Sequence, residues 1–163
     1  MSAFAHRAVL GTSPIEHYIV RMTKHTAHTE ISITAPADRV WAALTTPEVI
    51  KQFMFGADVH TDWKVGSPLT YTGEMQGKKY EEKGTIKKIE PNKVLAATHF
   101  SSMSGKPDVP ENYALVTWEL HPAQGKTVLS VEQDNIDSEK GVEQSNQNWS
   151  GVLQSIKKIV EAG

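Results

Sequence analysis

Two helix patterns at opposite ends of the chain, with only strand-like segments between them, most constrain the fold. The first pattern follows an alternating strand, Glu30–Ile33, through Ala35-Pro36 and places Val40 and Leu44 on one face. The second runs over residues 138–162, with apolar residues at i, i+3 and i+4 spacing. Because short turns separate the segments between them, we expect a largely antiparallel sheet with a long C-terminal helix packed on it.

The central part of the chain predicts a series of strands bounded by turn residues. Thr46-Pro47 restarts a second short helix, with Thr46 as the N-cap. Gly77-Lys78 predicts a tight hairpin. The turn-rich segment Ser101–Glu111 predicts a mobile loop at one end of the sheet. The expected strands cover residues 24–34, 58–63, 69–76, 79–90, 94–100, 113–121 and 127–135.

Length and composition exclude several classes of protein. A chain of 163 residues is the size of one domain, large enough for a core and a cavity. Its net charge of −2 gives no basic surface for nucleic acid, and no apolar run has the roughly 20 residues of a membrane span. The absence of cysteine excludes disulfides and thiolate chemistry and fits a reducing compartment, so we expect a cytoplasmic protein.

The first 22 residues differ from the rest of the chain. They contain a short apolar patch, Ala8–Leu10, but not the apolar core of a signal peptide. Met22 stands just before the first expected strand. We therefore expect residues 1–22 to be a poorly ordered extension or the product of an upstream start codon, and residues 23–163 to be a single domain. A short helix packed on the domain is the alternative for the extension.

Four sequence blocks in order resemble a known superfamily. They are ISITAPADRVWAALTTPEVIKQF, GTIKKIEPNKVLAATH, ALVTWELHPAQGKTVLSVEQ and NWSGVLQSIKKIV. Together they resemble the START-like, or SRPBCC, superfamily, and most closely the branch named for the activator of the Hsp90 ATPase. The resemblance implies an α+β helix-grip fold: a curved antiparallel sheet of about six to seven strands, two short helices after the first strand, and a cavity under the C-terminal helix.

Members of this superfamily include binders of hydrophobic molecules, polyketide cyclases and the C-terminal domain of a co-chaperone. Fold alone therefore does not settle function. We rank binding of a small hydrophobic or amphipathic molecule, such as a lipid, first. A co-chaperone-like protein-interaction module with a chaperone as partner is second. A polyketide-cyclase-like enzyme is third, and whether the protein is an enzyme stays open.

Aromatic and polar side chains in phase with the inner faces of the expected elements are the candidate ligand contacts. Core packing is the ordinary role of any one of them. The candidate ligand-binding residues are Phe53, Phe55, Tyr71, Met75, Tyr80, His99, Trp118, Gln133, Trp149 and Leu153.

Three polar residues on the expected strands have alternative interpretations. His99, in phase with Leu95, is either a ligand anchor or proton-transfer group, or a histidine satisfied by a neighbouring strand. Glu82 has the inward phase, but the charged run KKYEEKG favours a solvated position. Gln133 is either a ligand contact near the cavity mouth or a satisfied amide at a strand end.

The sequence offers little for metal, cofactor or nucleophilic chemistry. Its seven histidines form no HxH or HxxxH pair beside carboxylates, so we expect no metal site. There is no glycine-rich nucleotide motif, no GxSxG and no catalytic triad at a recognisable spacing, so we expect no cofactor and assign no catalytic residue. The expected partner is a small hydrophobic ligand, with no nucleic acid.

Overall fold

The structure is a computed structural model that describes residues 24–163. The extension expected over residues 1–22 lies outside the described residues. The helices are α2 (Ala37–Thr45), α3 (Pro47–Phe53) and α4 (Glu139–Ala162), with a 3₁₀ turn at Pro110–Asn112. The strands are β1 (His25–Ile33), β2 (Asp58–His60), β3 (Pro68–Met75), β4 (Lys78–Glu90), β5 (Val94–Ser101), β6 (Ala114–Ala123) and β7 (Lys126–Ile136).

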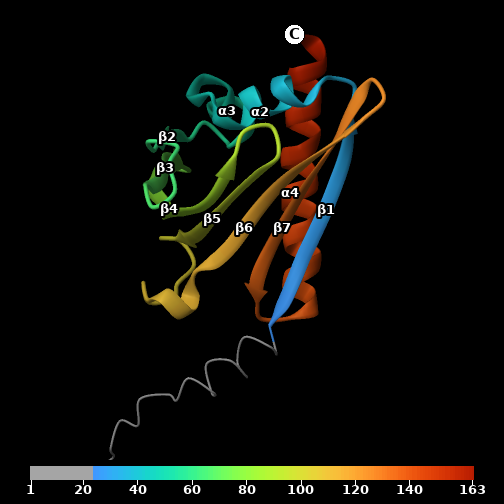
Figure 1. Ribbon diagram of the computed structural model, residues 1–163. Coiled ribbons are helices and arrows are strands. Elements are labelled where there is room, and N and C mark those ends of the chain that lie inside the picture. Colours follow the sequence, from blue (N-terminus) through green and yellow to red (C-terminus); the bar gives the residue numbers. More distant parts are fainter. Residues whose placement is uncertain (1–23) are drawn as a thin grey trace, which may run out of the picture.

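All the described strands belong to one antiparallel sheet in the order β1-β7-β6-β5-β4-β3-β2. Figure 1 shows α4 running along one face of the curved sheet, with α2 and α3 at the end of the sheet near the C-terminus. The connection from β1 to β2 contains both short helices, which brings β1 and β2 to opposite edges. The expected α+β helix-grip fold is thereby confirmed.

The long helix begins and packs as its sequence predicts. The Ser138 side chain accepts a hydrogen bond from the Gly141 backbone N–H at 3.1 Å and caps the helix. Val152, Leu153 and Ile156 are buried, whereas the residues between them on the other face are exposed. This amphipathic stripe holds α4 against the sheet.

Local backbone conformation explains the small differences from the expected elements. The strand expected over residues 58–63 ends at His60, and Trp63 has φ +56°, in the left-handed region that strands do not use. Thr46 precedes α3 as expected, but its side chain makes no capping hydrogen bond. The hairpin turn is Gln76-Gly77, one residue earlier than the predicted Gly77-Lys78, because Lys78 already pairs with Met75. Both turn residues have positive φ, which suits the twist of a β-hairpin.

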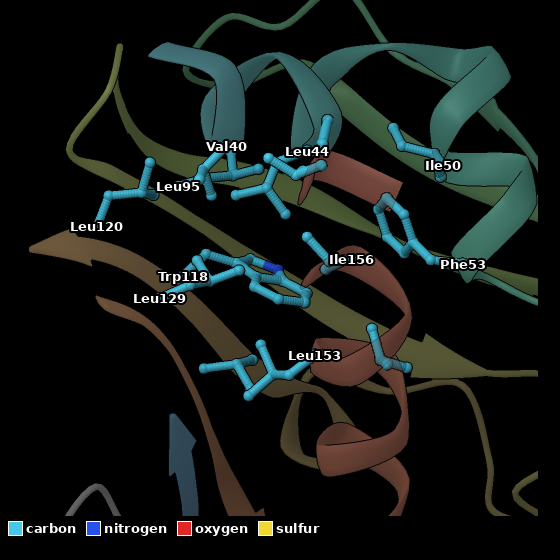
Figure 2. Packing of buried hydrophobic residues seen from close by; sticks show 14 of the residues in the cluster. Val40, Leu44, Ile50, Phe53, Leu95, Trp118, Leu120, Leu129, Leu153 and Ile156 are labelled. Carbon is cyan, nitrogen blue, oxygen red and sulfur yellow. The ribbon is translucent and has the colours of Figure 1, made fainter. Parts of the chain in front are cut away.

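The core lies between the sheet and all three helices. Figure 2 shows the Trp118 ring inside it, between Leu44 from α2 and Leu153 from α4. Ile33, Leu129 and Ile156 are fully buried. This apolar burial, at about 25 cal/mol per Å², is the main force that holds the helices on the sheet.

The pairing of β4 with β5 is distorted in the middle. Gly84 lies so close to β5 that an added Cβ would be 1.6 Å from the Thr98 carbonyl oxygen. The Thr85 backbone N–H donates to the Thr98 side-chain Oγ1 at 2.9 Å. A register shift follows between Ile86 and Lys88. These features bend the sheet next to His99, and such irregularities often re-aim side chains at functional sites.

Candidate functional site

Two adjoining cavities lie between the sheet and the helices. The outer cavity has a volume of about 490 Å³. The inner one has a volume of only about 40 Å³. Met54, Tyr71, His99 and Trp149 line both. Free space therefore lies mainly beside the first half of α4, and side chains nearly fill the region deeper under the helix.

The inner cavity is bounded mainly by the hydrophobic core. Trp118 from β6 meets Trp149 from α4 edge to face, with ring centroids 5.4 Å apart. Phe53 and Leu69 close the other side. This wall offers an apolar surface to whatever occupies the outer cavity. The full lining is Leu44, Ile50, Phe53, Met54, Leu69, Tyr71, Lys83, Leu95, Ala97, Thr98, His99, Val116, Trp118 and Trp149.

The outer cavity combines aromatic, methionine and polar side chains from α4, the strands and two loops. Its polar groups include one carboxylate and one imidazole, but no lysine or arginine. The amphipathic character of this lining suits a molecule with an apolar body and a polar end. The full lining is Met54, Phe55, Ala57, Tyr71, Met75, Tyr80, Glu82, His99, Ser101, Met103, Gln133, Ser145, Asn148, Trp149 and Val152.

Glu82 and His99 form a hydrogen-bonded pair at the cavity wall. The His99 Nε2 and Glu82 Oε2 atoms are 2.9 Å apart, and each side chain is 27% exposed. The solvated position that the charged run favoured for Glu82 is therefore wrong. The register shift in β4 lies beyond Ile86, so the alternation from Tyr80 to Ile86 stays intact and Glu82 points inward with them.

Two tyrosines lie next to this pair. Tyr71 is directly opposite Glu82 in the β3–β4 register. Burial, and then the negative charge of Glu82, raises the pKa of Tyr71, and the same two causes raise the pKa of Tyr80. Both side chains therefore stay hydroxyls at neutral pH. The Tyr80 ring lies over Gly73 on the paired strand, where an added Cβ would be 2.6 Å from the Tyr80 hydroxyl oxygen.

Gln133 is positioned by Trp149. The Trp149 indole N–H donates to Gln133 Oε1 at 2.8 Å, across from α4 to β7. This bond satisfies the partly buried indole N–H, and the Gln133 Nε2 group has no hydrogen-bond partner within residues 24–163. Gln133 thus has a structural bond, and its role as a ligand contact near the cavity mouth stays a prediction.

Exposed apolar side chains surround the cavity mouth. Phe55 is 71% exposed, Met75 48% and Met103 54%, and all three line the outer cavity. Phe55 also has φ +55°, which is uncommon for a bulky residue. We call these three residues the apolar rim. They come from the loop after α3, the end of β3 and the loop after β5.

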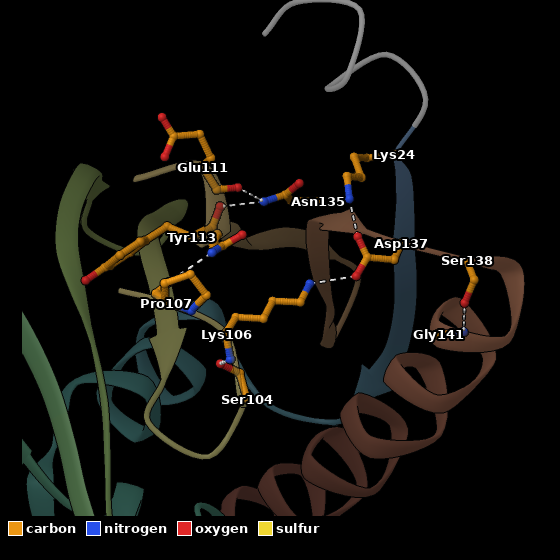
Figure 3. A network of polar contacts seen from close by, with 11 residues as sticks. Lys24, Ser104, Lys106, Pro107, Glu111, Tyr113, Asn135, Asp137, Ser138 and Gly141 are labelled. Atoms are coloured by element: carbon orange, nitrogen blue, oxygen red, sulfur yellow. Dashed lines mark hydrogen bonds and ion pairs between the residues drawn. The ribbon is translucent and has the colours of Figure 1, made fainter. Parts of the chain in front are cut away.

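The loop after β5 is tied to the rest of the domain by polar contacts (Figure 3). Lys106 Nζ lies 2.6 Å from Asp137 Oδ2, and the Asn135 amide donates to the Glu111 carbonyl at 2.8 Å. Hydrogen bonds from Lys106 and then Lys24 lower the pKa of Asp137 to about 2. The mobility expected for this loop stays a prediction.

Most of the residues expected at the site line one of the cavities. Leu153 is the exception, because it is 1% exposed and belongs to the packed core. Phe53 and Trp118 line only the inner cavity. The rest line the outer cavity, and their role as ligand contacts stays a prediction: Phe55, Tyr71, Met75, Tyr80, His99, Gln133 and Trp149.

Sequence reasoning missed the contribution of α4 to the outer cavity. Ser145 and Asn148 precede Trp149 and Val152 on the same helix face, and all four line the cavity. The signal was present: small polar residues occupy positions where the apolar stripe would otherwise continue. Met54 and Met103 were also missed, since loop residues follow no periodicity.

Two further features bear on the class of protein. Within the described part of the chain, no group of three or more histidine and acidic side chains could hold a metal ion. The helices described between residues 24 and 163 are too short or too polar to cross a membrane.

The fold and its cavity place the chain in the SRPBCC class of helix-grip domains. Residues 34–161 match the family model described as activator of Hsp90 ATPase homolog 1-like protein. The chain belongs to this family. No curated protein matches it significantly.

Solved structures show the same fold. A solution structure from Cytophaga hutchinsonii is 42% identical, covers 85% of this chain and 95% of its own, and has a TM-score of 0.76. The Aha1 dimer from Colwellia psychrerythraea is 21% identical, with 84% and 96% covered and a TM-score of 0.67. Ara h 8.0201 is 16% identical, with 86% and 99% covered and a TM-score of 0.67. The last two likenesses concern the fold alone.

Proposed function

We propose that this domain binds a small amphipathic or hydrophobic molecule in the outer cavity. The observation that carries the proposal is the hollow of about 490 Å³ between α4 and the sheet, within the size range of small-molecule sites. Its inner side is the apolar wall around Trp149, and its polar groups include Glu82 and His99. An apolar body would lie against the wall, and a polar end would face the Glu82–His99 pair.

A matched pair of substitutions on α4 tests this proposal. Ser145 lines the outer cavity, whereas Ser155 is exposed on the same helix and lines neither cavity. We expect the uncharged dye Nile red to bind the wild-type protein saturably. Ser145→Trp should fill the cavity and weaken binding by roughly tenfold or more, and Ser155→Trp should leave it unchanged. Absence of saturable binding, or equal affinity in the two variants, would reject the proposal.

Binding to a chaperone is a second candidate function. It is supported by the family description, which refers to an activator of the Hsp90 ATPase, and by the exposed apolar rim. Purified domain should then raise the ATPase rate of Hsp90, and Phe55→Ser should reduce this effect. Val65→Ser is the control, because Val65 is 65% exposed but lines neither cavity. An unchanged ATPase rate would eliminate this candidate.

A further inference from the structure

The charges around the outer cavity point to one kind of polar group on its ligand. Among the residues that line it, Glu82 carries the one carboxylate, and no ammonium or guanidinium faces it. Lys83 touches the inner cavity, but its ammonium lies 2.5 Å from the carboxylate of Asp108. An anionic ligand would therefore meet Glu82 with no lysine or arginine to compensate its charge.

The hydrogen-bonding capacity of the Glu82–His99 pair also favours a ligand group that donates hydrogen bonds. An ionised carboxylate only accepts hydrogen bonds, at both of its oxygens, and the bond to His99 involves Glu82 Oε2. Oε1 makes no hydrogen bond within the described part of the chain. With the proton on Nε2, a neutral His99 ring also presents Nδ1 as an acceptor. A ligand group that fits this site is a donor.

Aromatic side chains line the same cavity. Tyr71 pairs with Glu82 across β3 and β4, the Tyr80 ring lies close to Gly73 on the paired strand, and Trp149 lines the cavity from α4. Aromatic faces attract cations, most strongly where water is displaced. The tyrosines keep their protons near Glu82, so they add no second negative charge.

We propose that the outer cavity selects apolar molecules that carry a cationic amine, with the ammonium bound to Glu82 among Tyr71, Tyr80 and Trp149. This inference rests on the proposed binding function and names the chemical class of its ligand. The ammonium donates to the Glu82 carboxylate, and the alkyl or ring body lies along the apolar wall. Carboxylates of the same size are rejected.

Three ligands with one body and different charges test the selection. Octylamine, octanol and octanoate share an eight-carbon chain and carry a positive, zero and negative charge at neutral pH. A hydrogen bond to a charged group is stronger than one between neutral groups, so we expect octylamine to bind about tenfold more tightly than octanol. Octanoate should bind most weakly. Competition against Nile red gives all three affinities under one condition.

Glu82→Gln should remove the advantage of octylamine over octanol, with each affinity measured against that variant's own affinity for Nile red. Glu81→Gln is the matched control, because Glu81 is the exposed neighbour on β4 and lines neither the inner nor the outer cavity. The ranking of octylamine, octanol and octanoate by affinity uses the wild-type protein alone, so it tests the proposal even if Glu82→Gln does not fold.

The outcomes separate the two proposals. If Nile red does not bind, the binding function itself fails, and the selection fails with it. If Nile red binds but octylamine binds no better than octanol, or octanoate binds best, the binding function stands and the selection of amines is overturned. The same holds if Glu82→Gln and Glu81→Gln change the octylamine affinity equally.

Discussion

At the scale of single residues, Glu82 interacts with three other polar residues of the site. It is a carboxylate on an inward-facing strand position, partly shielded from water, and His99 is its hydrogen-bonded partner. Its charge acts on both neighbouring tyrosines. A partly buried charge is costly unless it is paired, and such charges are more common at functional sites than in ordinary cores.

Tyr71 supplies a test of this environment through the pH dependence of stability. Its folded-state pKa is raised above the value of 10.0 for an ordinary tyrosine. Above that pH the unfolded chain releases a proton that the folded chain keeps, so the free energy of unfolding falls as pH rises. Tyr71→Phe should make this fall shallower, by at most about 1.4 kcal/mol per pH unit. Urea denaturation at about pH 9 and about pH 11 measures the difference.

The pKa values of Tyr80 and Tyr113 are also raised, so these residues contribute to the pH dependence of stability. Their contribution is the same in the wild-type protein and in Tyr71→Phe, and it cancels in the comparison. Equal slopes for the wild-type protein and Tyr71→Phe would show that Tyr71 ionises in the folded protein as it does in water. Tyr71 would then not be shielded from water beside the negative charge of Glu82, contrary to the description above.

At the scale of elements, the distortion between β4 and β5 shapes the cavity wall. Gly84 permits the close approach of the two strands, and Thr98 uses its side chain to bond the Thr85 N–H. The bend lies directly before His99 in β5. A side chain at Gly84 would push the strands apart at the point where the Glu82–His99 pair forms.

Two glycine-to-alanine substitutions should therefore have opposite effects. Gly84→Ala should lower the free energy of unfolding by about 1–3 kcal/mol, because its Cβ would overlap β5 backbone. Gly151→Ala should raise it by about 0.5–1 kcal/mol, since Gly151 is exposed within α4 and an added Cβ meets nothing within 4 Å. Urea denaturation of both variants checks the signs. An unchanged free energy of unfolding for Gly84→Ala would mean that β4 and β5 move apart there at little cost.

At the scale of the whole molecule, packed core and open cavity are divided along α4. The second half of the helix, with Leu153 and Ile156, belongs to the packed core. The first half, with Ser145 and Asn148, lines the outer cavity. Packing the polar side chains of Ser145 and Asn148 against the sheet would add little stability. Leaving the space beside them open costs the apolar contacts that this half of the helix could otherwise make. Such a division is expected when a domain keeps a hollow for a ligand.

Leu153→Ala tests this division. The side chain is 1% exposed and lines neither cavity, so its removal should lower the free energy of unfolding by about 2–5 kcal/mol. Nile red affinity of the folded variant should match that of the wild-type protein. Denaturation and dye titration on the same sample give both values, and a large loss of affinity would place Leu153 in the binding site.

The sequence by itself determined the elements and their order. Alternation in β6, the apolar stripe of α4 and the hairpin at Gly77 each depend on near neighbours in the chain, so these patterns can be recognised without coordinates. The helix-grip arrangement then followed, because one long amphipathic helix and a run of hairpins have few ways to bury their apolar faces.

Only the tertiary structure decided where the cavity lies and what faces it. Glu82 looked solvated in its charged run, but the position of the register shift keeps it inward, where it meets His99 from another strand. Leu153 looked like a pocket residue, but the core fills that end of α4. Both outcomes depend on pairing and packing between residues distant in the chain, and a one-residue change in register reverses the face of a side chain.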